Sequence, residues 1–391
     1  MKHRAMFVSL LLMAAFLALA PGAAASNIWY ANGVSGSDSN SCRSAQTACK
    51  TIGHAILLAS PGDSIMVAPA IYKENLTLTS SLNIWGSRAA TTIIDGQAAA
   101  SVVTVSNGNA KIGLSQLTIQ NGFNKQGGGI YNAGILTISN VHVTGNVAGG
   151  HGGGIGAGGG VEAGIYNSGT LTINNSTVGG NQARGNIENL AHGGGIYNSG
   201  TVSVNGSTIS SNNAYGLGGG IVNDSAARIV NSTISGNNGL VWGGALVSRA
   251  STTISNSTIS GNSSQYDPGG IDLLYGTVAL QNSIVADNSG GNCYGTLTSS
   301  GHNLSSDATC NFNGPGDMNH TDPLLGPLQN NGGPTQTMAL LPGSLALDAG
   351  NPSGCTDGQG HLLKTDQRGQ PRPDKEDSGG CDIGAYERQS D

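Results

Sequence analysis

Residues 127–146 read GGGIYNAGILTISNVHVTGN, and this segment recurs along the middle of the chain with its order of residue types preserved. Two clear copies are GGGIYNSGTVSVNGSTISSN at 193–212 and GGGIVNDSAARIVNSTISGN at 218–237. The last Asn of each of six copies marks the period: Asn146, Asn181, Asn212, Asn237, Asn262 and Asn288. The spacings are 35, 31, 25, 25 and 26 residues, so the unit is about 25 residues long and two copies carry insertions. A fixed period of this length is typical of a solenoid.

Each copy holds three short apolar clusters, in the pattern GG-I, then L-x-I, then the Ile or Val of a segment such as STI. β-branched residues alternate with polar ones, and Gly, Asn and Ser fill the gaps, as in short strands separated by turns. The repeats lack the 3.6-residue periodicity of a helix. We therefore predict an all-β fold with three strands per coil, in which each strand pairs with its equivalent one coil away at about 4.8 Å.

One turn of the repeat carries Asn in five copies and Gly206 in the sixth. Stacked Asn side chains can hydrogen-bond to one another along the axis of stacked strands, so we expect a ladder there. Its members are Asn140, Asn175, Asn231, Asn256 and Asn282.

The composition fits an ordered solenoid that does not bind nucleic acid. The chain has 391 residues, of which 64 are Gly; 37% are hydrophobic and only 10% are charged. This balance argues against disorder. The net charge is −6 and no basic cluster is present, which argues against a nucleic-acid partner.

Residues 1–25 have the features of a secretory signal: a basic start, an apolar core and a small-residue cleavage site at Ala23-Ala24-Ala25. No later apolar stretch approaches the length of a membrane-spanning helix. We expect a secreted or cell-surface protein that does not span a membrane.

Six Cys residues suit an oxidising compartment. They occur as three local pairs outside the six repeats, and neighbours in sequence are the simplest disulfides, although six Cys allow 15 connectivities. The pairs are Cys42 with Cys49, Cys293 with Cys310, and Cys355 with Cys381. Metal binding by these residues is the alternative, but no C-x₂-C spacing supports it, so we predict no metal site and no cofactor.

Residues 26–62 are predicted to cap the first coil, because an open solenoid end exposes core side chains and unpaired strands. Ile52, Ala55, Ile56 and Ala59 share one helical face, so a short helix should lie across the end.

The segment PGDSIMVAPAIYKENL, which begins at Pro61, together with the repeats after it, resembles the pectate-lyase-like superfamily. This resemblance implies a right-handed, single-stranded parallel β-helix over residues 63–291. That fold carries lyases, hydrolases, adhesins and tailspikes, so the resemblance is specific for fold and not for activity.

Residues 292–391 differ in composition, and eight of the twelve Pro lie between 315 and 373. The stretch from TDPLLGPLQNNGG to CDIGAYE, residues 321–387, resembles the choice-of-anchor Q domain of secreted bacterial β-helix proteins. We expect a loop-rich C-terminal cap closed by a charge network of Asp366, Arg368, Asp382 and Glu387. A calcium site is the alternative, since carboxylates and loop carbonyls suit that ion.

The two insertions, within 147–164 and 182–195, occur at the same turn of the coil. Insertions on one side of a solenoid often build a binding face, although surface loops of this kind are also well tolerated.

The basic residues of the repeats are few, and a lyase needs a base together with a cation that neutralises the substrate carboxylate. Asp224, Arg249 and Asp272 lie near the start of successive units and form the catalytic candidate; a surface ion pair is the alternative. No pair of Asp residues suggests an inverting hydrolase.

A column of Tyr residues follows the GG-I position on three consecutive coils: Tyr131, Tyr166 and Tyr197. Later coils are expected to place Val222, Leu246 and Asp272 in the same column. Tyr offers a flat apolar face with a polar tip, so the column could bind sugar; the alternative is that the insertion loops bury it.

The regular repeats and the shortage of titratable groups favour a non-catalytic protein that binds a polysaccharide or cell-surface glycan, or acts as an adhesin-like spacer. The alternative is a polysaccharide lyase or glycoside hydrolase acting on an acidic polysaccharide. The sequence leaves open whether the protein is an enzyme.

Overall fold

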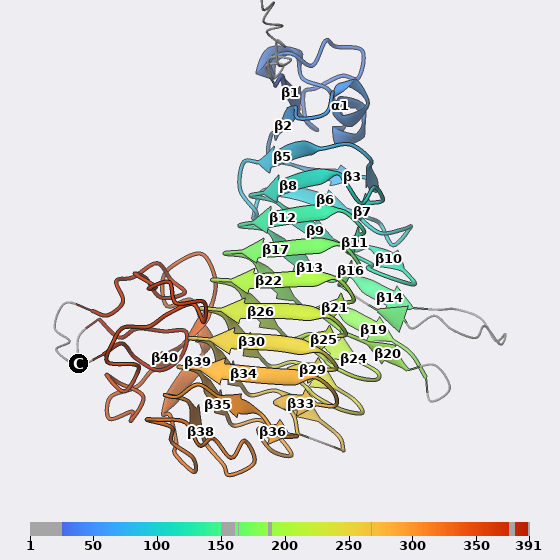
Figure 1. The fold of residues 1–391 in the computed structure, drawn as a ribbon. Helices are drawn as coiled ribbons and strands as arrows, with labels where there is room; N and C mark the ends of the chain where they lie inside the picture. The colour runs from blue at the N-terminus through green and yellow to red at the C-terminus, as the bar shows by residue number, and fades with distance from the viewer. Residues whose placement is uncertain are drawn as a thin grey trace, which may run out of the picture.

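The computed structural model describes residues 26–149, 161–162, 164–186, 190–266, 268–374 and 380–389. The expected signal sequence, 1–25, lies outside the described residues, as do residues 150–160 of the first insertion. The chain folds as a right-handed parallel β-helix, in which successive turns of the chain stack as coils (Figure 1). The predicted all-β fold is confirmed.

Three parallel sheets run along the axis of the helix. Sheet A consists of β1 (Ile28–Ala31), β2 (Ser64–Val67), β5 (Leu82–Gly86), β8 (Lys111–Ser115), β12 (Ile135–Ser139), β17 (Thr170–Asn174), β22 (Thr201–Asn205), β26 (Ala226–Val230), β30 (Ser251–Ser255), β34 (Thr277–Gln281) and β37 (Thr298–Ser299). Sheet B consists of β3 (Ala70–Lys73), β6 (Thr92–Asp95), β9 (Thr118–Gln120), β13 (His142–Thr144), β18 (Thr177–Gly179), β23 (Thr208–Ser210), β27 (Thr233–Ser235), β31 (Thr258–Ser260), β35 (Ile284–Ala286) and β38 (Leu304–Ser305). Sheet C consists of β4 (Leu76–Leu78), β7 (Val103–Val105), β11 (Ile130–Asn132), β16 (Ile165–Asn167), β21 (Ile196–Asn198), β25 (Ile221–Asn223), β29 (Leu246–Ser248), β33 (Ile271–Leu273) and β36 (Cys293–Tyr294).

A fourth, short sheet was not predicted. Sheet D consists of β10 (Phe123–Asn124), β14 (Val147–Gly149), β19 (Gln182–Arg184), β24 (Asn213–Ala214), β28 (Asn238–Gly239) and β32 (Ser263–Ser264). The strand β15 (Val161–Glu162) of the first insertion pairs with the strand β20 (Ala191–His192) of the second insertion. The strands of sheet D are rich in Asn, Ser and Gly, so they lack the alternation of β-branched residues that marks the strands of sheets A, B and C.

The register of sheet A stacks β-branched residues in an inward column. Ile173 pairs with Val204, Val204 with Ile229, and Ile229 with Ile254 on successive coils. All four side chains are at most 1% exposed. Because side chains alternate between the two faces of a strand, the residues between them point outward, away from the core.

The expected Asn ladder at the turn between sheets A and B is largely wrong. The five Asn residues adopt φ between 47° and 54°, the left-handed conformation of a tight turn. Among the described residues the amides of Asn231 and Asn256 donate to carbonyls of Thr365 and Thr356, and one ladder bond joins Asn282 to Asn256.

Two other Asn columns form the ladders, at turns where the side chain points into the core. One column is bonded amide to carbonyl at 2.9–3.0 Å: Asn146, Asn181, Asn212, Asn237, Asn262 and Asn288. The other is bonded at 2.7–2.8 Å: Asn132, Asn167, Asn198 and Asn223. Burial alone does not separate the two kinds of column, because Asn231, Asn256 and Asn282 are buried too. Their amides donate to backbone carbonyls of the C-terminal region instead of to the next coil, apart from the one bond between Asn282 and Asn256.

The N-terminal cap contains α1 (Ile52–Leu58), which lies at the end of the helix in Figure 1, with Ile52 and Ala55 buried as predicted. The cap also supplies β1, the first strand of sheet A. All three predicted disulfides are present. The seven-residue α1 is too short to cross a bilayer, and no other helix of the described chain is long and apolar enough to do so.

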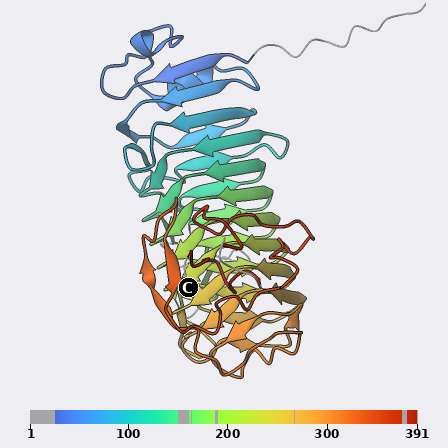
Figure 2. The same cartoon turned by 90° about the vertical axis from the view of Figure 1, so that its left-hand side faces the viewer.

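The C-terminal region extends the β-helix and then folds back on it. β36, β37 and β38 add one more coil, so parallel pairing continues past residue 291. In the part of the following chain that the structure describes, β39 (Leu325–Gln329) and β40 (Thr337–Leu340) form an antiparallel pair, and most of the remaining residues lie in loops. Figures 1 and 2 show this orange-to-red part against one side of the later coils.

Candidate functional site

The outer face of sheet A carries a long hollow that ends against the C-terminal region. Its first outward row passes from strand to strand through Tyr30, Met66, Trp85, Ser115, Ser139, Asn174 and Asn205. Its second outward row passes through Asn83, Gly113, Thr137, Thr172, Ser203 and Arg228. We call these two rows and the C-terminal residues beside them the sheet A groove.

Three adjoining cavities make up the groove. The first, of about 170 Å³, lies between Tyr30, Met66 and Trp85, and the second, of about 410 Å³, runs from Trp85 to Ser139. The third, of about 740 Å³, runs from Ser139 to Arg228 and is walled by the C-terminal region. Because neighbouring cavities share Trp85 and Ser139, the three cavities adjoin one another along the axis of the helix.

The N-terminal end of the groove is aromatic. Trp85 is 46% exposed, although it lies within the β5 strand, and it shares its cavity with Tyr30 and Met66. An exposed Trp beside a second aromatic ring offers a flat apolar face with polar edges.

The middle of the groove is lined by hydroxyl groups that the protein itself does not use. The side chains of Ser115, Thr137, Ser139 and Thr172 are half-buried and make no hydrogen bond to any described residue. Hydroxyls both donate and accept, so this surface can bond to a ligand rich in hydroxyl groups.

At the C-terminal end a chain of hydrogen bonds crosses from sheet A to the C-terminal region. The amide of Asn205 donates to Asn174 at 3.0 Å, and Arg228 donates to Asn205 at 3.3 Å. Arg228 also forms an ion pair with Asp357 at 2.5 Å. Arg228 thus links the outer face of sheet A to the C-terminal region.

The carboxylates of this cavity are already bonded. Asp357 accepts from the backbone N–H groups of Gln359 and His361 and from the Arg228 side chain. Burial alone would raise the pKa of Asp357, but these hydrogen bonds and the Arg228 charge outweigh it and hold the pKa below its usual value.

Asp366 is buried and accepts from Arg368, from the Gln370 N–H and from the Glu387 N–H. An ionised carboxylate surrounded by protein donors is a poor general base, because its lone pairs are occupied. The cavity is therefore better suited to binding than to proton transfer.

The catalytic candidates come together only in part. Arg249 lies 3.1 Å from Asp224, and the Tyr197 hydroxyl donates to the same carboxylate. Asp272 is buried in β33, where it pairs with Val247 of the preceding coil. Arg249 lies two residues after Val247, so Asp272 is not level with it. The cluster faces outward from sheet C and lies away from the sheet A groove.

The predicted Tyr column forms, with its rings stacked along the axis. The ring centroids of Tyr131 and Tyr166 are 5.2 Å apart, and those of Tyr166 and Tyr197 are 5.9 Å apart, with interplanar angles of 16° and 7°. Both faces of the Tyr166 ring are therefore turned toward neighbouring rings, and its edge is left for a ligand.

The position predicted for Leu246 in this column is wrong. Val247 pairs with Val222 and Asp272, whereas Leu246 pairs with Ile221 and Ile271 in the core. The fifth copy reads GGA at 243–245, where the copies that begin at 127, 193 and 218 read GGG. Ala245 takes the place of the third Gly, which shifts the alignment by one residue.

His192 joins the Asp224–Arg249 cluster, which sequence reasoning missed. Its Nδ1 accepts from the Leu217 N–H at 3.2 Å. Burial first, and then the positive charge of Arg249, lowers the pKa of His192 to about 4, while Asp224 acts in the opposite direction. His151, which like His192 precedes a GGG segment in an insertion, lies outside the described residues.

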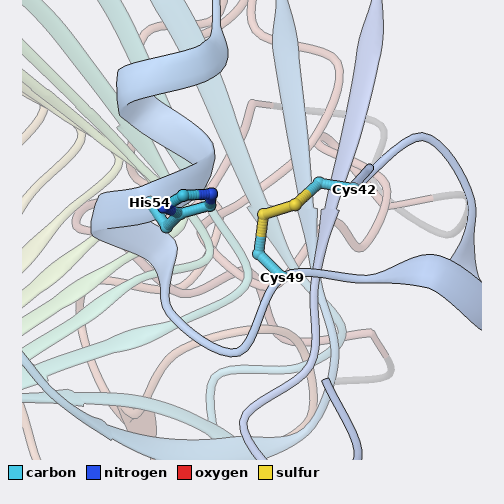
Figure 3. A group of neighbouring side chains, drawn as sticks. All are labelled: Cys42, Cys49 and His54. Atoms are coloured by element: carbon cyan, nitrogen blue, oxygen red, sulfur yellow. A yellow bond between two sulfur atoms is a disulfide. The ribbon is translucent and has the colours of Figure 1, made fainter. Parts of the chain in front are cut away.

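The N-terminal cap brings a third side chain to one disulfide. Ligand atoms of Cys42, Cys49 and His54 lie within 4.8 Å of one another (Figure 3). Cys42 and Cys49 are joined as a disulfide, which removes the thiolates that a metal ion would need.

The expected charge network of the C-terminal cap is present in part. Asp366 pairs with Arg368 at 2.7 Å, but the partner of Glu387 is Arg372, also at 2.7 Å, which the sequence reading had not named. Asp382 accepts from the backbone N–H groups of Asp348 and Arg388.

No family model and no curated protein sequence matches the chain. Among solved structures, the chain is similar to pectate lyase Pel9A, with 14% identity over 94% of this chain and 98% of that one, at a TM-score of 0.49. It is also similar to XylC in complex with xylose, with 10% identity over 92% of this chain and 98% of that one, at a TM-score of 0.39. A further similar structure is pectin methylesterase PemA from Erwinia chrysanthemi, with 15% identity over 73% of this chain and 82% of that one, at a TM-score of 0.38. We draw no activity from these similarities, and the assignment of the fold rests on the strand pairing described above.

Proposed function

We propose that the protein binds an extended glycan along the sheet A groove and does not cleave it. The observation that carries this proposal is the row of three adjoining cavities, from the aromatic cavity at Trp85, past unused hydroxyls, to the cavity at Arg228. A linear polymer lying along the axis would meet a new strand, and a new pair of outward side chains, about every 4.8 Å.

The absence of catalysis is supported by the state of the acidic groups in the groove. Asp357 and Asp366 are each bonded to several donors, and each is paired with an Arg. Neither is left to take a proton from a substrate. A lyase or hydrolase acting on an acidic polysaccharide remains the competing function, and turnover is the outcome that would favour it.

We further propose that the protein is exported and that residues 321–387 form a domain of the choice-of-anchor Q type. Three disulfides support an oxidising destination. Mass spectrometry of the mature N-terminus after expression with the full leader tests export: a start at Ser26 is expected, and an intact Met1 in exported material contradicts it.

The binding proposal is tested by affinity electrophoresis on a panel of polysaccharides, followed by calorimetry on those that retain the protein. Replacing Trp85 by Ala is expected to weaken binding about tenfold, which corresponds to about 1.4 kcal/mol. Trp242→Ala is the matched control, because Trp242 is 38% exposed but lies outside the three cavities.

Tyr166→Ala separates the two candidate surfaces. If binding falls in Tyr166→Ala and not in Trp85→Ala, the ligand lies on the Tyr column of sheet C and the groove proposal is wrong. The same samples are assayed for new reducing ends and for unsaturated sugar ends, with and without calcium. Product formation that grows with time would replace binding by catalysis.

A further inference from the structure

The charges that line the sheet A groove nearly cancel. The three cavities include five charged residues among those lining them: Lys111, Arg228, Asp357, Asp366 and Arg368. Arg228 is paired with Asp357 at 2.5 Å and Arg368 with Asp366 at 2.7 Å. Lys111 is exposed and is the one lining charge without an ion pair among the described residues.

We propose that the ligand of the groove is an uncharged polysaccharide; this inference rests on the proposed function. An acidic polysaccharide carries a negative charge at regular intervals, and burying those charges without cations beside them is costly. The groove supplies one unpaired amine over its whole length, while the chain as a whole carries a net charge of −6. Both features oppose a polyanion.

The arginines of the groove are held in place by the protein. Arg228 donates from one terminal nitrogen to Asn205 and from the other to both the carboxylate and the backbone carbonyl of Asp357. Turning Arg228 toward an anionic ligand would break these bonds and leave Asp357 without its cation.

Arg368 is held in a similar way. It donates to the Asp366 carboxylate and to backbone carbonyls of Asn331 and Glu387, and its guanidinium lies 3.6 Å from the centre of the Tyr386 ring. The two guanidiniums thus bond to protein groups in the walls of the cavity. The groups left to bond to a ligand are the neutral hydroxyls and amides of the two outward rows.

The test compares a neutral glucomannan with polygalacturonate at low and at physiological ionic strength, using the full-length mature protein. We expect binding of the neutral polymer with little dependence on salt, because no ion pair forms with the ligand. Tighter binding of polygalacturonate that weakens as salt is added overturns this inference and leaves the groove proposal standing if Trp85→Ala still weakens it.

Asp357→Asn provides the second arm, because it removes the charge that balances Arg228 and keeps the shape of the side chain. The variant is expected to gain about tenfold in affinity for polygalacturonate at low salt. Asp348→Asn, at an exposed carboxylate of the same region, is expected to gain nothing. An equal gain in affinity in both variants overturns the role given to Arg228 and Asp357. If neither polymer binds the wild-type protein, the proposed function is overturned together with this inference.

Discussion

The guanidinium of Arg228 in β26 lies 2.5 Å from the carboxylate of Asp357, 129 residues further along the chain. This ion pair ties the outer face of sheet A to the C-terminal region at the edge of the largest of the three cavities of the groove. The two side chains are 23% and 13% exposed, so water screens the pair only in part. The C-terminal region is therefore a wall of the candidate binding site as well as a cap.

A double-mutant cycle measures what this contact contributes to stability. We expect Arg228→Met and Asp357→Asn to couple by about 1 kcal/mol in urea unfolding, between the values typical of exposed and buried pairs. The Arg184→Met and Asp357→Asn pair serves as the control cycle, because Arg184 is exposed and, among the described residues, its side chain bonds only to Gln182. A coupling energy no larger than that of the control would show that the pair does not hold the C-terminal region in place.

Arg372 is the buried anchor of the C-terminal region. It bonds to Glu387 at 2.7 Å, to Asn231 of the turn after β26 at 2.9 Å and to the Gly384 carbonyl, and both partners of the ion pair are fully buried. We expect Arg372→Met to lower the free energy of unfolding by about 3–5 kcal/mol, the usual effect of removing one partner of a buried pair.

The loss in Arg372→Met should depend on pH. Burial raises the pKa of Glu387 from 4.5 to about 7 against the opposing charge of Arg372. A carboxyl with a raised folded-state pKa favours folding most in acid, and this contribution is lost as the pH rises from 4.5 through 7. Without Arg372 the pKa should rise further, so the variant should be least stable, relative to the wild type, in alkaline solution. A loss that is equal at all pH values would contradict this account.

The inner Asn ladder should matter more for stability than the Asn residues of the outer row. The side chain of Asn212 is 1% exposed; it donates to the Val178 carbonyl and Asn237 and accepts from Asn181. We expect Asn212→Ala to cost about 3 kcal/mol, because it leaves buried polar groups without partners. Asn174→Ala, in the half-buried outer row, should cost less than about 1 kcal/mol. Equal losses in chemical denaturation would refute the distinction.

The sequence predicted the coils because the period of about 25 residues and the alternation of Ile and Val are both direct consequences of stacking. It misplaced the Asn ladder because an Asn in a left-handed turn and an Asn turned into the core are not distinguishable by residue type. Asn231 and Asn212 illustrate the two cases, with φ of 48° at the first and a side chain 1% exposed at the second.

The groove was not predicted because its parts are distant or ordinary in sequence. Arg228 and Asp357 meet only when the C-terminal region folds back, and no local pattern specifies that contact. The outward Ser, Thr and Asn residues of sheet A resemble any solvated strand face. The one signal present was Trp85, a large aromatic residue at an outward strand position of a chain that has only three Trp.

The last prediction concerns His192, which gives the stability of the β-helix a dependence on acid. In the folded protein the pKa of His192 is about 4, compared with an ordinary value of 6.5. As the pH falls below 6.5 the unfolded chain takes up the proton first, so the folded state loses stability down to about pH 4. The loss attributable to this group is at most about 3 kcal/mol, since one pKa unit corresponds to about 1.4 kcal/mol.

This loss of stability is measured by urea unfolding at a series of pH values between 6.5 and 4. His192→Asn should remove this part of the slope while keeping an acceptor for the Leu217 N–H. His320→Asn, at an exposed histidine, should leave the slope as it is. If the wild type and His192→Asn lose stability in parallel between pH 6.5 and 4, the acid sensitivity comes from other groups and the assignment to His192 is wrong.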